Sequence, residues 1–95
     1  IQTDVLNHLR KIKNSEWTKS TITNRAGIQD IIGHINGYYI AIEVKNELTR
    51  PSKLQEFRIS ETNIKGGYSF WATSWAEVRN NLLRFAENKN FSLFI

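Results

Sequence analysis

The 95-residue chain contains no cysteine, and this absence limits the kinds of site that it can build. Without cysteine the chain forms neither disulfides nor thiolate metal sites. Any metal held by carboxylates would be a hard cation such as Mg²⁺ or Mn²⁺. The sequence therefore excludes disulfide scaffolds and metal sites built from thiolates.

The sequence also lacks an apolar run long enough to cross a bilayer, a signal-peptide pattern and a low-complexity segment. We therefore expect an intracellular, soluble protein, cytoplasmic or nucleoid-associated, with no membrane partner. A chain of this length with 40% hydrophobic residues can build one core but not two. We expect residues 1–95 to form one domain.

Positive charge exceeds negative charge, with 13 Lys and Arg against 9 Asp and Glu, a formal net charge of +4 and a pI near 9.6. A domain this basic is typical of nucleic-acid binding, because neutralising phosphates supplies most of the non-specific affinity. The basic residues form no dense run, so charge alone would equally suit a protein that is merely kept soluble. Basic surroundings combined with clustered carboxylates would suit a nuclease.

The dipeptide Asn36-Gly37 predicts a two-residue β-hairpin turn. With these residues as the turn, Ile35 pairs with Tyr38, and the hairpin arms run from about residue 28 to 35 and from 38 to 44. Side chains alternate along each arm, so one face of the hairpin is apolar. That face carries Ile31, Ile35, Ile40, Ile42 and Val44.

The other face of the hairpin brings two carboxylates together. Counting outward from the turn places Asp30 opposite Glu43, with Cβ atoms about 4.5–5.5 Å apart, and Lys45 follows on the same face. Like charges directly opposite each other destabilise a strand pair unless a metal or a raised pKa compensates. The alternative is an ordinary solvated face, because Glu-Val-Lys by itself is a common strand tripeptide.

Periodicity predicts the elements before the hairpin. Apolar residues at positions 1, 5, 9 and 12 predict an amphipathic helix that ends near Asn14. The segment Trp17–Thr23 is rich in threonine and β-branched residues, which favours a strand. With the hairpin, this gives three antiparallel strands.

Two capping patterns predict the helices after the hairpin. Ser52 with Gln55 opens a helix that ends at Gly66-Gly67, and Ser74 with Glu77 opens another. The helix that Ser52 opens has the stripe Leu54, Phe57, Glu61 and Ile64. The helix that Ser74 opens buries Val78, Leu82, Phe85 and Ala86. A strand at Tyr68–Thr73 lies between them, and a further strand at Phe91–Ile95 would end the chain. The expected fold is α/β, in the order αβββαβα.

This order of elements, with an acidic residue followed by Glu-X-Lys, resembles the PD-(D/E)XK nuclease superfamily, which includes restriction enzymes and archaeal Holliday-junction resolvases. Four motifs resemble more narrowly the VRR-NUC (virus-type replication-repair nuclease) family. They are Gly27-Ile28-Gln29-Asp30, Ile42-Glu43-Val44-Lys45, Ser52 with Gln55, and Gly66-Gly67. The resemblance covers nearly the whole chain and implies a restriction-endonuclease-like core, a central mixed sheet flanked by helices.

The resemblance implies a Mg²⁺-dependent endonuclease acting on DNA, with Mn²⁺ able to substitute. Asp30, Glu43 and the backbone carbonyl of Val44 would bind the metal, and Lys45 would orient or activate the attacking water. Gln55 would help to hold that water or the geometry of the site. As the third residue of its helix, it would equally bond back to the helix cap, and the two roles do not exclude each other.

The chain departs from the family pattern at two places. The family usually has a proline where Gln29 stands, a residue that shapes backbone rather than chemistry. Many relatives also carry a Glu on the first helix as an additional metal ligand, where this chain offers only Asp4 or, at an alternative position, Gln2. Without that Glu one metal site would be weakened, which argues against catalysis by two metal ions.

The resemblance extends to the partners. It implies branched or otherwise structured DNA, as for a Holliday-junction resolvase in DNA repair, and a homodimer that presents two sites. We expect the DNA backbone to be contacted by Arg25, Arg50, Lys53 and Lys65. Two alternatives stay open: a non-catalytic nucleic-acid-binding module that retains the nuclease fold, and a purely structural interaction domain.

Aromatic residues offer further surfaces. Tyr38 and Tyr39 follow the hairpin turn and face opposite ways, so at least one should be exposed beside a substrate groove, without a catalytic role. The aromatic and apolar residues of Tyr68–Trp75, together with Ile59, would form a self-complementary dimer patch or complete the core.

Overall fold

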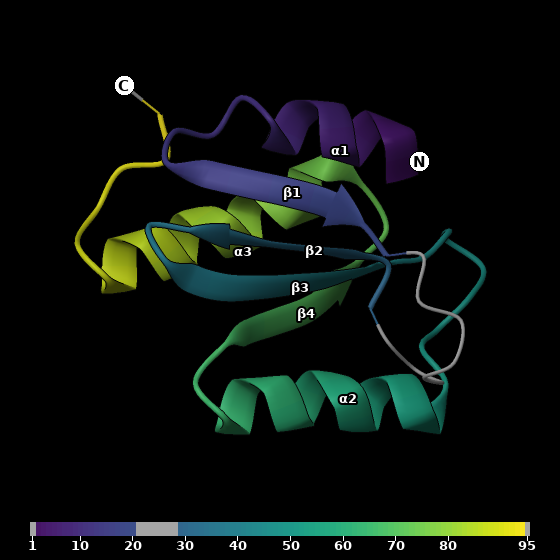
Figure 1. The fold of residues 1–95 in the computed structure, drawn as a ribbon. Coiled ribbons are helices and arrows are strands. Elements are labelled where there is room, and N and C mark those ends of the chain that lie inside the picture. Colours follow the sequence, from purple (N-terminus) through teal and green to yellow (C-terminus); the bar gives the residue numbers. More distant parts are fainter. Residues whose placement is uncertain (1, 21–28, 95) are drawn as a thin grey trace.

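The protein folds as a four-stranded mixed sheet with helices on both faces (Figure 1). A computed structural model describes residues 2–20 and 29–94. In chain order the elements are α1 (Gln2–Leu9), β1 (Ser15–Lys19), β2 (Ile31–Ile35), β3 (Tyr38–Val44), α2 (Lys53–Ile64), β4 (Tyr68–Ala72) and α3 (Trp75–Asn88). This is the αβββαβα order that the sequence predicts. None of the described helices is long and apolar enough to cross a bilayer.

The strands lie in the order β1-β2-β3-β4, with β1, β2 and β3 antiparallel and β4 parallel to β3. Asn36 and Gly37 form the turn between β2 and β3, with φ angles of 50° and 84°. Both positions need positive φ, which Asn and Gly tolerate best. Ile35 pairs with Tyr38, so the predicted hairpin register is confirmed.

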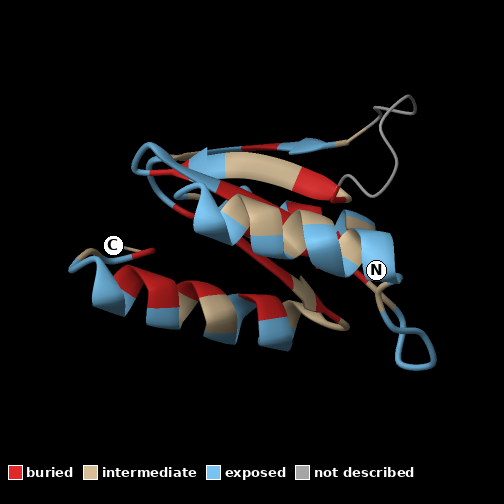
Figure 2. Ribbon diagram, turned by 90° about the horizontal axis from the view of Figure 1, so that it is seen from below, coloured by how far each residue is buried: buried red, intermediate tan, exposed pale blue. Residues whose placement is uncertain are grey.

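One face of the sheet is covered by α1 and α3, and the other by α2 (Figures 1 and 2). The apolar core lies on the first face. Its fully buried members include Val5, Leu9, Ile31, Ile35, Ile40, Ile42, Val78 and Leu82. Burying an aliphatic side chain of this size contributes roughly 1.5–3 kcal/mol. This face therefore supplies most of the apolar stabilisation, and the opposite face is left for polar groups.

The helix α2 buries none of its residues, which corrects the predicted apolar stripe (Figure 2). Leu54, Phe57 and Ile64 are 40%, 55% and 81% exposed. Polar contacts instead join α2 to the sheet, since the Asn63 amide exchanges two hydrogen bonds with the backbone of Ser69, at 2.8 and 2.9 Å. The apolar spacing correctly indicated a helix but not the side on which it docks.

The first helix is shorter than predicted, because it ends at Leu9 rather than near Asn14. After Leu9 the backbone hydrogen bonds tighten from i−4 to i−3 partners, as in Ile12 N–H to the Leu9 carbonyl at 3.0 Å. Ile12 is still buried, although it lies in the turn that follows the helix. The strand predicted at Trp17–Thr23 is β1, and residues 21–23 lie outside the described residues.

The predicted strand at Phe91–Ile95 is wrong for residues 91–94, and Ile95 lies outside the described residues. Leu93 is buried, and its carbonyl accepts a hydrogen bond of 3.0 Å from the backbone N–H of Lys13. The segment therefore packs beside the connection between α1 and β1 without joining the sheet.

The last helix buries the predicted residues Val78, Leu82, Phe85 and Ala86. Its expected capping box is only half formed. The Ser74 hydroxyl accepts from the backbone N–H of Glu77 at 3.2 Å, but the Glu77 carboxylate accepts from the backbone N–H and hydroxyl of Thr73, at 2.6 and 3.0 Å.

The aromatic segment that leads into α3 completes the core. Phe70 and Ala72 are buried, and the Tyr68 ring stacks on Phe85 at 4.7 Å between centroids. Tyr68, Phe70 and Ala72 therefore help to complete the core, while a dimer patch that includes Ile59 and Trp71 stays a prediction.

Candidate active site

The carboxylates of Asp30 and Glu43 lie side by side where the β2–β3 hairpin ends. Ile31 pairs with Ile42, which places Asp30, the residue before β2, next to Glu43. The Asp30 Oδ2 accepts a hydrogen bond of 2.9 Å from the backbone N–H of Val44. The predicted register thus brings the two acids together, and a backbone contact fixes one of them.

Glu43 is 2% exposed, and its two carboxylate oxygens have different surroundings. Oε2 accepts a hydrogen bond of 2.8 Å from the Gln55 amide and lies 3.2 Å from the Lys45 ammonium. Oε1 is buried and has no hydrogen-bond partner among the described residues. An unsatisfied buried oxygen costs about 1–3 kcal/mol, so the site favours any species that would bind it.

Burial raises the pKa of Glu43 from its usual 4.5 to about 7. The neighbouring Asp30 charge contributes to this rise, as does a hydrogen bond that a protonated Glu43 can give to Asp30. The Lys45 ammonium lowers the pKa through its hydrogen bond and its charge, but does not cancel the rise. Near neutral pH Glu43 is therefore close to its pKa, so it can be either protonated or charged. A bound cation would stabilise the charged form.

Gln55 links the site to the start of α2. Its side-chain oxygen accepts from the Ser52 backbone N–H at 2.9 Å, and its amide nitrogen donates to Glu43. The Ser52 hydroxyl accepts in return from the Gln55 backbone N–H at 3.1 Å, which completes a capping box. The Gln55 side chain thus caps α2 with its oxygen and contacts Glu43 with its nitrogen.

The donor set of this site fits one hard cation. Asp30, Glu43 and the Val44 carbonyl offer oxygen atoms, which Mg²⁺ and Mn²⁺ prefer, and Mg²⁺ commonly binds through one or two carboxylates and water. Within residues 2–20 and 29–94, no group of three or more His, Cys, Asp or Glu side chains gathers as a metal site. Asp4 on α1 lies 3.7 Å from His8 instead. The described residues therefore supply no third acid.

Gln29 fixes the segment that leads into Asp30, a role that the sequence did not reveal. Its side chain is 2% exposed, and its amide nitrogen donates to the Ser69 hydroxyl at 2.9 Å and to the Thr62 hydroxyl at 3.2 Å. The Ser69 hydroxyl in turn donates to the Ala41 carbonyl at 2.7 Å. Gln29 thus anchors the segment before Asp30 to α2 and β4. These partners lie 33 and 40 residues away in sequence, so no local pattern marks them.

Of the residues predicted to contact DNA, Arg50, Lys53 and Lys65 lie within the described residues, at the two ends of α2 and just before it. The Arg50 guanidinium lies over the Trp71 ring, 5.3 Å from its centroid. Lys53 opens α2 and Lys65 follows its end, so about 18 Å of helix separates them. Arg25 lies outside the described residues.

No protein-family model matches this sequence, and no curated protein shows significant sequence similarity to it. Its structure is similar to a solved structure described as a VRR_NUC domain, with a TM-score of 0.72 and 20% sequence identity. The similarity covers 85% of this chain and 88% of the other. At this identity the similarity shows the fold, and activity has to be argued from the site. The chain has the fold of a VRR_NUC domain, as its motifs predict.

Proposed function

We propose that this protein is a metal-dependent DNA endonuclease that hydrolyses phosphodiester bonds at the Asp30 and Glu43 pair. One observation carries the proposal: the buried Glu43 Oε1 has no hydrogen-bond partner among the described residues, and a second carboxylate lies beside it. A divalent cation relieves both the missing contact and the repulsion between the carboxylates. The VRR_NUC fold and the net charge of +4 support the same function.

Each residue of the site has a part in this chemistry. Asp30, Glu43 and the Val44 carbonyl would hold Mg²⁺ or Mn²⁺, which would neutralise a phosphate oxygen and lower the pKa of bound water. Lys45 holds positive charge 3.2 Å from Glu43, where it can orient the attacking hydroxide and offset transition-state charge. Gln55 fixes the orientation of the Glu43 carboxylate through its 2.8 Å hydrogen bond.

The proposed substrate is branched or otherwise structured DNA, as for the Holliday-junction resolvases of DNA repair that the motifs resemble. A domain of this size has little room for an element that reads bases in the major groove, which argues against sequence-specific cutting. Cutting both strands of a junction needs two sites at a fixed separation, and a two-fold homodimer would supply them. Sedimentation analysis with and without DNA tests this part, because a strict monomer would contradict it.

A cleavage assay tests the activity itself. The protein is incubated with nicked, flapped and four-way DNA in the presence of Mg²⁺, Mn²⁺ or excess chelator. We expect cleavage of at least one structured substrate with either metal and none with chelator. Intact DNA under every metal condition would contradict the proposal.

A second candidate is a nucleic-acid-binding module that does not cleave. It is favoured by the absence of a third acidic ligand among the described residues and by the pairing of Asp4 with His8. The same assay separates the two, since this candidate would bind DNA and leave it intact with both metals.

A further inference from the structure

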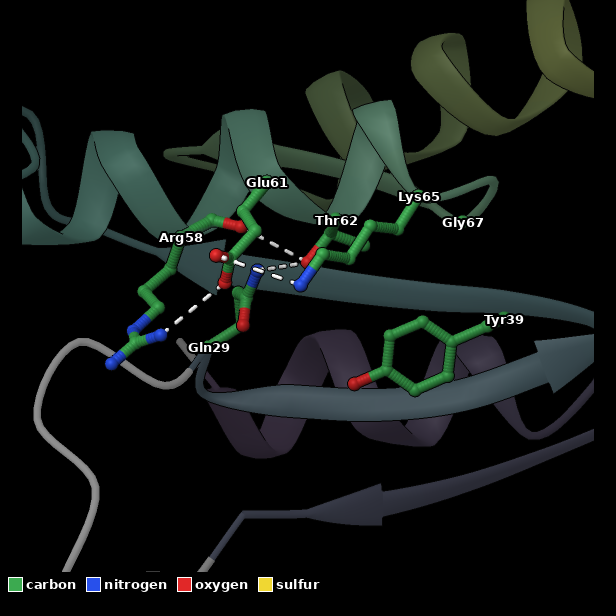
Figure 3. A pocket seen from close by; sticks show the side chains of 7 residues that line it. All are labelled: Gln29, Tyr39, Arg58, Glu61, Thr62, Lys65 and Gly67. Carbon is green, nitrogen blue, oxygen red and sulfur yellow. Dashed lines mark hydrogen bonds and ion pairs between the residues drawn. The ribbon is translucent and has the colours of Figure 1, made fainter.

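Tyr39 stands between two hollows on the α2 face of the sheet. The first, with a volume of about 310 Å³, lies between α2 and β3 and is lined by Tyr39, Arg58 and Lys65 among others (Figure 3). The second, of about 410 Å³, lies over β1 and β2 and includes Ile32 and Thr18. Tyr39 lines both hollows and is 45% exposed, so its ring offers a flat aromatic surface to solvent.

One edge of the Tyr39 ring packs against the backbone at Gly67. A Cβ atom at Gly67 would come within 3.0 Å of the ring and 2.8 Å of the Thr62 methyl group, closer than packed carbons approach. Glycine at this position therefore lets the ring lie against the backbone. A ring held in place before a ligand arrives loses little conformational freedom on binding.

The first hollow has a cationic wall. Arg58 and Lys65 lie on the α2 side, and both contact the Glu61 carboxylate, at 3.3 and 3.7 Å. The three side chains together carry one net positive charge. The Lys65 side chain is 73% exposed, and an ion pair so exposed is weak, so the ammonium can turn to an incoming anion at little cost.

This surface lies on the same face of the sheet as the Asp30 and Glu43 pair. Tyr39 and Glu43 lie on the same strand and the same face, separated by about 13 Å. Along α2, Gln55 contacts Glu43 and Arg58, one turn later, lines the first hollow. Gln29, which precedes Asp30, lines the same hollow. A strand bound at the carboxylates would therefore run toward Tyr39.

We propose that this surface binds an unpaired segment of the DNA strand, with a base stacked on Tyr39 and a neighbouring phosphate facing Lys65 and Arg58. A nucleotide combines a flat base with an anion, which matches an exposed ring beside a hollow that has a cationic wall. The inference rests on the proposed function and narrows its substrate class to DNA that carries unpaired nucleotides, such as a flap.

Binding in the presence of chelator tests this inference without cleavage. Fluorescence anisotropy measures the affinity of the full chain for a labelled oligothymidylate of about ten nucleotides and for a duplex of equal length. We expect Tyr39→Ala to weaken single-strand binding roughly five- to a hundredfold, with duplex binding unchanged and single-strand binding restored in Tyr39→Phe. Tyr38 is a matched control, because it precedes Tyr39 on β3, is 37% exposed, faces the opposite side of the sheet and lines neither hollow. Tyr38→Ala should bind like the parent once its folding is confirmed.

Single-strand affinity in Tyr39→Ala equal to that of the parent would overturn the inference, and so would a parent protein that does not bind the oligothymidylate. The cleavage assay fails or succeeds independently. Tyr39-dependent binding without metal-dependent cleavage would support the inference and contradict the nuclease. Metal-dependent cleavage, together with single-strand binding that does not depend on Tyr39, would support the nuclease and overturn the inference.

Discussion

The side-chain amide of Gln55 donates a 2.8 Å hydrogen bond to the Glu43 carboxylate while its oxygen caps the first turn of α2. One residue thus couples the position of a helix to the orientation of a candidate metal ligand. The two functions can be separated by mutation, because Ser52 takes part only in the cap.

Ser52→Ala should lower the free energy of unfolding by about 0.5–2 kcal/mol and leave the rate of DNA cleavage almost unchanged. Gln55→Ala should lower both, since it removes half of the cap and also the donor to Glu43. Urea unfolding and initial cleavage rates measure the two effects. Equal loss of cleavage in both variants would show that the amide contact with Glu43 has no separate role.

The stability of the metal-free protein should fall as the pH rises from 4.5 to about 7. The folded-state pKa of Glu43 is raised, so protonation favours the folded state, and this contribution is complete below 4.5 and lost as pH passes about 7. The loss should be on the order of 3 kcal/mol, at about 1.4 kcal/mol for each pKa unit. Glu43→Gln cannot titrate and should lose this part of the pH dependence. Identical stability profiles for parent and variant in chelator would contradict the assignment.

Gln29→Leu should destabilise the protein by about 1–3 kcal/mol, because it removes a buried amide that satisfies the Ser69 and Thr62 hydroxyls. Thr62→Val is the comparison variant: it removes the longer of the two hydrogen bonds and the bond from the Thr62 hydroxyl to the Arg58 carbonyl, but it keeps the buried bond from Gln29 to Ser69 and should cost less. Thermal or urea unfolding compares the three proteins. Parent-like stability of Gln29→Leu would mean that the segment before Asp30 is held by other contacts.

Lys45→Ala should lower the turnover rate far more than DNA affinity, because Lys45 lies at the carboxylates with its side chain 19% exposed. Lys53→Ala is the counterpart of this variant on the exposed start of α2 and should reduce DNA affinity. If Lys53 contacts one phosphate, the variant should also lower the slope of log affinity against log salt concentration by about 0.9. Anisotropy at several salt concentrations and single-turnover cleavage give both quantities. Similar losses of affinity in both variants would reduce Lys45 to a phosphate contact.

The hairpin and its carboxylate pair could be predicted because their determinants are local. Asn36 and Gly37 set the turn, the turn sets the pairing of Ile35 with Tyr38, and alternation then carries the register outward to Asp30 and Glu43. The order of elements follows in the same way from periodicity and capping residues close in sequence.

The docking of α2 could not be predicted, because it depends on contacts between distant residues. Gln29 reaches Thr62 and Ser69, which lie 33 and 40 residues away in sequence. These polar pairs have no periodicity, whereas the apolar Leu54 suggested the opposite side of the helix. The place of Tyr39 between two hollows likewise appears only when β3 and α2 are brought together.

The most direct test of the central claim compares DNA cleavage by the parent and by Glu43→Gln, a change that keeps the side-chain volume and removes the charge. Both proteins are incubated with flapped DNA in Mg²⁺, and their folding and DNA affinity in chelator are measured in parallel. The account predicts cleavage by the parent only, with the variant folded and binding DNA as the parent does. Cleavage by Glu43→Gln at the parent rate would contradict the assignment of the Asp30 and Glu43 pair as the active site.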